Sequence, residues 1–283
     1  MNIKNDYKKA EKVIKKHSKS FYAAFSTISN LDQRNAIYGI YAFCRYADDI
    51  VDESKDITKL EELKNQLDLF IQNKETPNYI FRLLKDISCK YYDENFNYEP
   101  YYDMIEGQYF DLDFKEIKDL NQSIWYSTKV ASSVGYMLMD ILAPNIRDDR
   151  KGFVAYHLGI GMQITNILRD IGEDLKRNRV YLPKELMDKY HVTMDDLIHK
   201  NINDNFINLF EALAKVAFEH YEKALLSIDV YPKETRIPLK LSLYIYREII
   251  NECRNNQYQV FQKRNKVSKK RKLEIIREVL ERE

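Results

Sequence analysis

The sequence has 283 residues, with 45 Lys and Arg against 44 Asp and Glu, and a formal net charge of +1. Because no overall field attracts polyanions, this balance excludes a general nucleic-acid-binding protein. Only 7 Gly and 6 Pro occur, which argues against a fold with many tight turns. The three cysteines lie far apart and form no C-x-x-C or zinc motif, so a reducing compartment is expected.

The chain begins with polar residues, and no charge-free apolar run reaches the roughly 18–20 residues that a membrane span requires. We therefore expect a soluble, cytoplasmic protein whose only membrane association is at its surface.

Apolar residues recur at steps of three and four along almost the whole chain, and no alternating strand pattern interrupts them. The pattern predicts an all-α fold, a helical bundle in which residues 1–283 form a single domain. Asn30 followed by Gln33 is typical of a helix N-cap with its reciprocal partner. The expected helices span 6–16, 19–28, 31–53, 56–73, 78–92, 99–110, 120–142, 149–175, 184–190, 194–200, 204–229, 235–257 and 268–281.

His17, Ser18 and Ser20 lie at the short break between the first two expected helices. Hydroxyl groups and free backbone amides at the start of a helix can bind an anion. Simple capping of the second helix explains these residues equally simply, so both interpretations stay open.

The third expected helix carries a polar stripe on an otherwise apolar sequence. Tyr41, Arg45, Asp48 and Asp52 follow one another at steps of 4, 3 and 4, which places them on one face. Because apolar residues flank this face, we expect it to line an interior cavity. Two carboxylates four residues apart repel each other, and a cation would relieve that repulsion.

A second stripe of the same kind lies in the expected helix 149–175. Gln163, Asn166, Asp170 and Asp174 follow at steps of 3, 4 and 4. One acidic pair is common in a sequence with 31% charged residues, but two pairs on apolar helices are not. Arg45 and Arg169 lie beside them. Since Mg²⁺ prefers carboxylate and phosphate oxygens and Arg neutralises phosphate, the two stripes predict a site that ionises a diphosphate.

Together with other motifs, the two stripes resemble the squalene/phytoene synthase family over residues 17 to about 264. The resemblance is carried by His17-Ser18-Lys19-Ser20-Phe21, by Tyr41 with Cys44-Arg45 and the aspartate pair, by Tyr126 before Val130-Ala131-Ser132-Ser133-Val134-Gly135, and by Leu158-Gly159 through Arg179-Val180-Tyr181-Leu182-Pro183. Within the family, the sequence is most similar to the bacterial dehydrosqualene (4,4'-diapophytoene) synthases. The resemblance implies an isoprenoid-synthase-like bundle around a central cavity.

The resemblance also implies roles for the residues. Asp48, Asp52, Asn166, Asp170 and Asp174 are expected to hold two or three Mg²⁺ ions. Catalytic roles fall on these aspartates together with Arg45, Tyr126 and Arg169. The residues expected to bind substrate are His17, Ser18, Ser20, Phe21, Tyr41, Arg45, Gln163, Asn166, Tyr246 and Arg264.

The implied reaction is the head-to-head joining of two farnesyl diphosphates by a Mg²⁺-dependent prenyltransferase. It passes through presqualene diphosphate to dehydrosqualene, an early step of C30 carotenoid biosynthesis, and no NADPH is expected. Two alternatives within the family stay open: a phytoene synthase, which joins two geranylgeranyl diphosphates, and an NADPH-dependent squalene synthase.

Two further alternatives lie outside that reaction. Asp48-Asp49-Ile50-Val51-Asp52 satisfies the D-D-x-x-D motif of chain-elongating prenyl synthases, but residues 170–174 have a single leading aspartate, which disfavours elongation. A non-catalytic, partner-binding helical protein would be expected to have lost one of the aspartate pairs, and both are intact.

Two predictions concern the rest of the cavity and the surface. Counting ten residues, or roughly 15 Å, back from Asp48 predicts that Tyr38 lies across the path of the substrate tail, with Phe25 as a second candidate. The run 263–272 has seven basic residues and suits peripheral contact with a membrane, although a solvated surface is its usual explanation.

Overall fold

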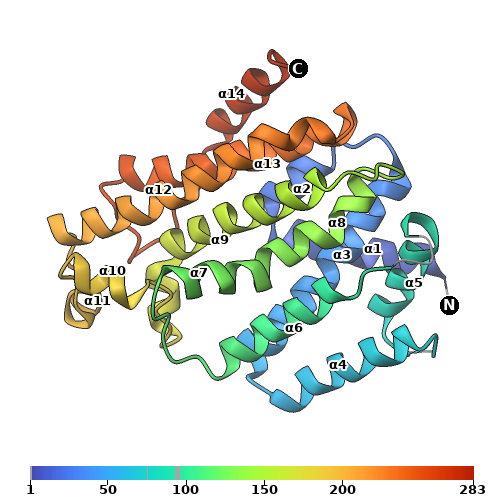
Figure 1. Cartoon of the computed structure of the whole chain (residues 1–283), viewed down its shortest axis with the longest axis horizontal. Helices are drawn as coiled ribbons and strands as arrows, with labels where there is room; N and C mark the ends of the chain where they lie inside the picture. Colours follow the sequence, from blue (N-terminus) through green and yellow to red (C-terminus); the bar gives the residue numbers. More distant parts are fainter. Residues whose placement is uncertain (1, 75, 93–95) are drawn as a thin grey trace.

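The computed structural model describes residues 2–74, 76–92 and 96–283 (Figure 1). Every regular element in this part of the chain is helical, which confirms the all-α prediction. The elements are α1 (Ile3–His17), α2 (Lys19–Phe25), α3 (Leu31–Asp49), η1 (Ile50–Ser54), α4 (Ile57–Ile71), α5 (Tyr79–Tyr91), α6 (Glu99–Leu112), α7 (Leu120–Ser127), η2 (Thr128–Ser132), α8 (Ser133–Leu142), α9 (Arg150–Lys176), α10 (Lys184–Lys189), α11 (Met194–His199), α12 (Asp204–Ser227), η3 (Ile228–Val230), α13 (Lys233–Asn255) and α14 (Lys269–Leu280).

Each expected helix is present, but two of them are interrupted. The expected helix 31–53 ends in a π-helical turn at Ile50–Ser54, and the expected helix 120–142 contains another at Thr128–Ser132. A π-turn contains one residue more than an α-helical turn. The apolar pattern continues through it, so the sequence periodicity does not reveal it. Both π-turns lie next to residues of the polar cavity described below.

The predicted cap of α3 is half correct. The Asn30 side chain accepts a hydrogen bond from the Gln33 amide at 3.0 Å, as expected. The Gln33 side chain does not reciprocate, because its Nε2 donates to the Ile141 carbonyl at 2.6 Å and so ties α3 to the end of α8. A complete capping box forms instead at Thr193 and Asp196, before α11.

The long helix α9 lies at the centre of the bundle. It packs against α8, α12, α13 and η2, and Figure 1 shows it running between these neighbours. Ile160, Ile164 and Leu168 on α9 are fully buried. Because the core anchors α9 along this apolar face, its polar stripe is held in a fixed direction.

Two glycines of α9 allow close helix packing. A Cβ atom added at Gly159 would lie 2.4 Å from the Ser132 backbone of η2, and one at Gly161 would lie 2.8 Å from the Tyr221 ring. These distances are far shorter than a normal contact. The glycines inside the helix therefore serve tight packing of the bundle.

Gly172, between the two aspartates of the second stripe, has a similar function. Its amide donates to the Val260 carbonyl at 3.2 Å, and an added Cβ would lie 2.3 Å from the Phe261 carbonyl oxygen. The segment between α13 and α14 thus rests directly on α9. This contact brings Arg264 next to Asp170, with 2.8 Å between Nη2 and Oδ2.

We expect Gly172→Ala to lower the free energy of unfolding by about 1–3 kcal/mol, because the new methyl group must displace the Phe261 backbone. Chemical denaturation measures this change. Gly152→Ala in the same helix is the matched control: its Cβ would meet only Tyr136, at 3.6 Å, so the better helix propensity of Ala should stabilise the protein. A Gly172→Ala protein as stable as the wild type contradicts the packing argument.

Candidate active site

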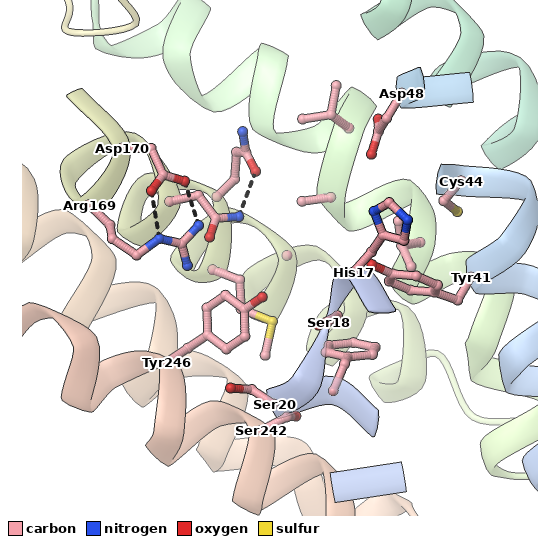
Figure 2. A pocket seen from close by; sticks show the side chains of 18 of the residues that line it. His17, Ser18, Ser20, Tyr41, Cys44, Asp48, Arg169, Asp170, Ser242 and Tyr246 are labelled. Carbon is pink, nitrogen blue, oxygen red and sulfur yellow. Dashed lines mark hydrogen bonds and ion pairs between the residues drawn. The ribbon is translucent and has the colours of Figure 1, made fainter. Parts of the chain in front are cut away.

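A cavity of about 880 Å³ opens between α2, α3, α6, α8, α9 and α13 and is lined in part by residues 264–267 and Lys272 (Figure 2). Every residue that the sequence marked for metal or substrate binding lines it. These residues are His17, Ser18, Ser20, Phe21, Tyr41, Arg45, Asp48, Asp52, Tyr126, Gln163, Asn166, Arg169, Asp170, Asp174, Tyr246 and Arg264. The structure brings them to one place; their chemical roles stay predictions.

The two acidic stripes face each other across this cavity. Figure 2 shows Asp48 and Asp170 on opposite walls, with Tyr41 and Tyr246 directed into the space between them. Asp48 accepts a hydrogen bond from Gln108 Nε2 at 2.8 Å. Burial raises the pKa of Asp48 to about 7, with a further contribution from the charges of Asp52 and Asp111, against the opposing effect of Arg45.

Asp52 lies in the π-turn that follows α3 and is held by two arginines. Its carboxylate oxygens are 2.8 Å from Arg177 Nη1 and 3.3 Å from Arg179 Nη1. The chain reverses after α9 because Asn178 adopts a left-handed conformation, with φ of 59°, which Asn tolerates well. The reversal directs Arg179 back towards Asp52, so the end of α9 is clamped to the end of α3.

Asp170 and Asp174 differ in their electrostatic surroundings. Asp170 is paired with Arg169 through two hydrogen bonds of 2.8 and 2.5 Å, and with Arg264 at 2.8 Å. Burial raises the pKa of Asp174 to about 8, and the negative charge of Asp170 adds to this effect. The second stripe therefore contains one carboxylate that is neutralised by arginines and one that is not.

Arg45 is held by a carboxylate outside the cavity. Its guanidinium forms an ion pair with Asp49, one residue beyond Asp48 and outside the cavity lining. Asp49 therefore orients Arg45, whose Nε is buried without a hydrogen-bond partner among the described residues.

The donor atoms at the acidic end fit hard divalent cations. Asn166 donates to Gln163 Oε1 at 3.2 Å, whereas its own Oδ1 is buried and accepts no hydrogen bond in the described structure. An unpaired amide oxygen next to carboxyl groups with raised pKa values is an oxygen-rich environment short of positive charge. Within residues 2–74, 76–92 and 96–283, no three Asp, Glu, His or Cys side chains gather closely enough to hold a metal ion by themselves.

Sequence reasoning missed Asp111, which lies on α6 and is buried. Its two carboxylate oxygens accept hydrogen bonds from the hydroxyls of Tyr126 and Tyr181, each at 2.8 Å, and the two tyrosine rings stack with centroids 5.1 Å apart. Burial raises the pKa of Asp111 to about 6. Gln108 and Asp111, three residues apart on an apolar helix, form a third polar stripe that helical spacing could have revealed.

Basic side chains from several elements line the cavity in addition to those that the sequence marked. Lys272 on α14 donates to Ser20 Oγ at 3.0 Å, which joins the C-terminal part of the chain to α2. Burial, with the charge of Arg45, lowers the pKa of His17, so this imidazole is neutral at pH 7. The basic side chains that line the cavity beyond those expected are Lys16, Lys19, Lys266, Lys272, Arg177 and Arg179.

The deep part of the cavity is apolar, and here the Tyr38 prediction is wrong. Tyr38 is 1% exposed and packs against the Tyr22 ring, with centroids 5.7 Å apart, without lining the cavity. The physical reason is a neighbouring helix: helical spacing places Tyr38 close to the face of the stripe, but Tyr22 of α2 packs against its ring. The second candidate, Phe25, does line the cavity. The apolar wall consists of Phe25, Leu138, Leu142, Val154, Leu158, Tyr231 and Leu239.

Comparison with known proteins finds a family and relatives that match almost the whole chain. The sequence profile of the squalene/phytoene synthase family matches residues 14–271. The 4,4'-diapophytoene synthase of Staphylococcus haemolyticus (strain JCSC1435) is 31% identical over 97% of this chain and 96% of its own length. A chloroplastic phytoene synthase from an Oncidium hybrid cultivar is 31% identical over 94% of this chain and 66% of its own length.

One solved structure has a similar fold over almost the whole chain. The crystal structure of a dehydrosqualene synthase in complex with a ligand superimposes with a TM-score of 0.93, at 35% identity over 99% of this chain and 97% of that one. The family profile and these similarities identify an enzyme of the prenyl-transferring type. The chain belongs to the squalene/phytoene synthase family.

Proposed function

We propose that the protein joins two farnesyl diphosphates head to head, through presqualene diphosphate, to form dehydrosqualene (4,4'-diapophytoene). The observation that carries this proposal is a single cavity with two opposed acidic walls and an apolar deep end. Its similarity to a dehydrosqualene synthase structure and to a 4,4'-diapophytoene synthase supports this choice of substrate. C30 carotenoid biosynthesis is the corresponding pathway.

Divalent cations complete the acidic end in this proposal. Asp48, Asp52, Asn166, Asp170 and Asp174 would hold two or three Mg²⁺ ions. When bound, these ions supply the positive charge that stabilises the departing diphosphate. Their charge also keeps Asp48 and Asp174 ionised, despite the burial that raises the pKa of each.

The chain's own side chains bind and orient the two substrates. Arg45, Arg169 and Arg264 are positioned to neutralise diphosphate oxygens, and Ser18 and Ser20 can donate hydrogen bonds to them. The rings of Tyr41, Tyr126 and Tyr246 offer their faces to the carbocation that remains. The apolar wall excludes water, which would otherwise trap this cation as an alcohol.

NADPH does not take part in the proposed reaction, because proton loss in place of hydride addition completes dehydrosqualene. The alternative of a phytoene synthase is kept, since a phytoene synthase is among the relatives at 31% identity. The depth of the apolar end distinguishes the two substrates.

The proposed function is tested by incubating the protein with Mg²⁺ and farnesyl diphosphate, with and without NADPH, and by identifying the lipid product by mass. We expect dehydrosqualene under both conditions. Asp48→Asn should lower turnover by roughly two orders of magnitude or more, because it removes a ligand from the acidic wall. Asp49→Asn, outside the cavity lining, removes only the partner that orients Arg45 and should lower turnover much less. A squalene product that depends on NADPH, or equal losses in the two variants, contradicts the proposal.

Phe25 is expected to limit the length of the substrate tail. It is 1% exposed and closes the apolar wall, so Phe25→Ala should open space for a C20 tail. The cost is about 3–5 kcal/mol of stability, typical for an emptied aromatic site. With a mixture of farnesyl and geranylgeranyl diphosphates, we expect a C40 product from the variant.

Phe43→Ala is the control for that experiment. Phe43 is equally buried on α3 but packs against Phe81 and Tyr101, away from the cavity. If an active Phe25→Ala protein keeps the C30 preference, or if Phe43→Ala changes it as much, Phe25 does not set chain length.

A further inference from the structure

The basic run 263–272 does not form one surface. Arg264, Lys266 and Lys272 line the cavity, and Arg271 is occupied by three carboxylates. Those partners are Glu248, Glu274 and Glu278. The expectation that the whole run faces a membrane is therefore wrong for these four residues, and the exposed basic side chains must be considered separately.

Helix α14 presents two different faces. Ile275 and Val279 are buried where α14 packs on α13. On another side, Leu273 is 58% exposed and Leu280 is 54% exposed, and their spacing of seven residues places them on one stripe. Exposed Lys269, Lys270 and Arg277 lie beside this stripe. We define these five residues as the outer face of α14.

The outer face is fixed in place and directed outwards. The Glu283 side chain, 3% exposed, forms ion pairs with Arg236 and Lys240 at the start of α13 and so anchors the end of α14. Figure 1 shows α14 at the edge of the molecule, beyond α13 and on the side opposite α4.

The composition of the outer face indicates which partner it fits. Two aliphatic side chains flanked by three basic ones suit a surface that is negatively charged outside and apolar beneath, which describes an anionic lipid bilayer. The outer face itself carries three basic side chains and no acidic one. Glu278, which shares Arg271 with two other carboxylates, and Glu281 are exposed nearby. In the described part of the chain, no helix is long and apolar enough to cross a bilayer.

We propose that the outer face of α14 binds the surface of an anionic membrane. This inference rests on the proposed function, because the C15 tail of the substrate and the C30 hydrocarbon product both dissolve in bilayers rather than in water. Lys272 lines the cavity from the first turn of the same helix. A membrane bound at the outer face therefore lies one helix diameter from the cavity.

The test is co-sedimentation of the full chain with phosphatidylcholine vesicles, with and without phosphatidylglycerol. We expect binding that requires phosphatidylglycerol, weakens with salt, and falls by about tenfold or more in Leu273→Asp/Leu280→Asp. Ile57→Asp on α4 is the matched control, since Ile57 is 55% exposed on the opposite side of the molecule and should leave binding unchanged.

A second measurement separates this inference from the proposed function. In detergent micelles, the double variant should form product from farnesyl diphosphate as the wild type does, because neither leucine lines the cavity. No product from either protein contradicts the proposed function alone. Equal vesicle binding by wild type and double variant, or an equal loss in Ile57→Asp, overturns the membrane assignment. A wild-type dimer in sedimentation velocity that the double variant abolishes, without vesicle binding, assigns the face to a second copy of the chain instead.

Discussion

The arrangement of this protein depends on carboxyl groups that are buried without enough positive charge to balance them. The pKa values of Asp48, Asp111 and Asp174 are raised to about 7, 6 and 8, in each case chiefly by burial. A folded chain tolerates such groups only if the rest of the structure holds them in place. In this bundle the apolar faces of α3, α6 and α9 do so. In the proposed function, divalent cations held between the acidic walls would supply the positive charge that balances them.

Arginines compensate the remaining carboxylates, and they connect distant parts of the chain in doing so. Arg177 and Arg179 join the end of α9 to Asp52 at the end of α3, and Arg264 joins the C-terminal segment to Asp170. The same guanidinium groups can bind diphosphate oxygens, so in the proposed function they would serve both the substrate and the contacts that hold the cavity together.

Helical periodicity predicted the helices and the two polar stripes that line the cavity. The stripes on α3 and α9 were visible because one polar residue every three or four positions contrasts with an apolar helix, and Phe25 was correctly placed as a second candidate for the deep wall. Residues such as Tyr126 and Tyr246 carry no such contrast in a chain with 22 tyrosines, and only family resemblance pointed to them.

What the sequence could not supply depends on contacts between distant segments. The Gln33 side chain donates to the Ile141 carbonyl rather than to its own helix. Tyr38 fails as a lining residue because Tyr22 of α2 packs against its ring, a contact that spacing along α3 does not reveal. Some residues of the basic run 263–272 line the cavity and others lie on the surface. The reason is that Phe261, just before the run, packs directly on Gly172 of α9.

The most direct test of the unbalanced buried charge is the thermal stability of Asp174→Asn without divalent cations. In the unfolded chain this carboxyl ionises near its ordinary pKa of 3.8, whereas the folded protein keeps the proton to about pH 8. Wild-type stability must therefore fall between these pH values, and an uncharged Asn avoids that loss. We expect the Tm of the variant to exceed that of the wild type by a margin that grows from about pH 5 to about pH 8. Asp113→Asn, at an exposed position, should show no such trend. A wild type as stable as Asp174→Asn at pH 8 would contradict the account.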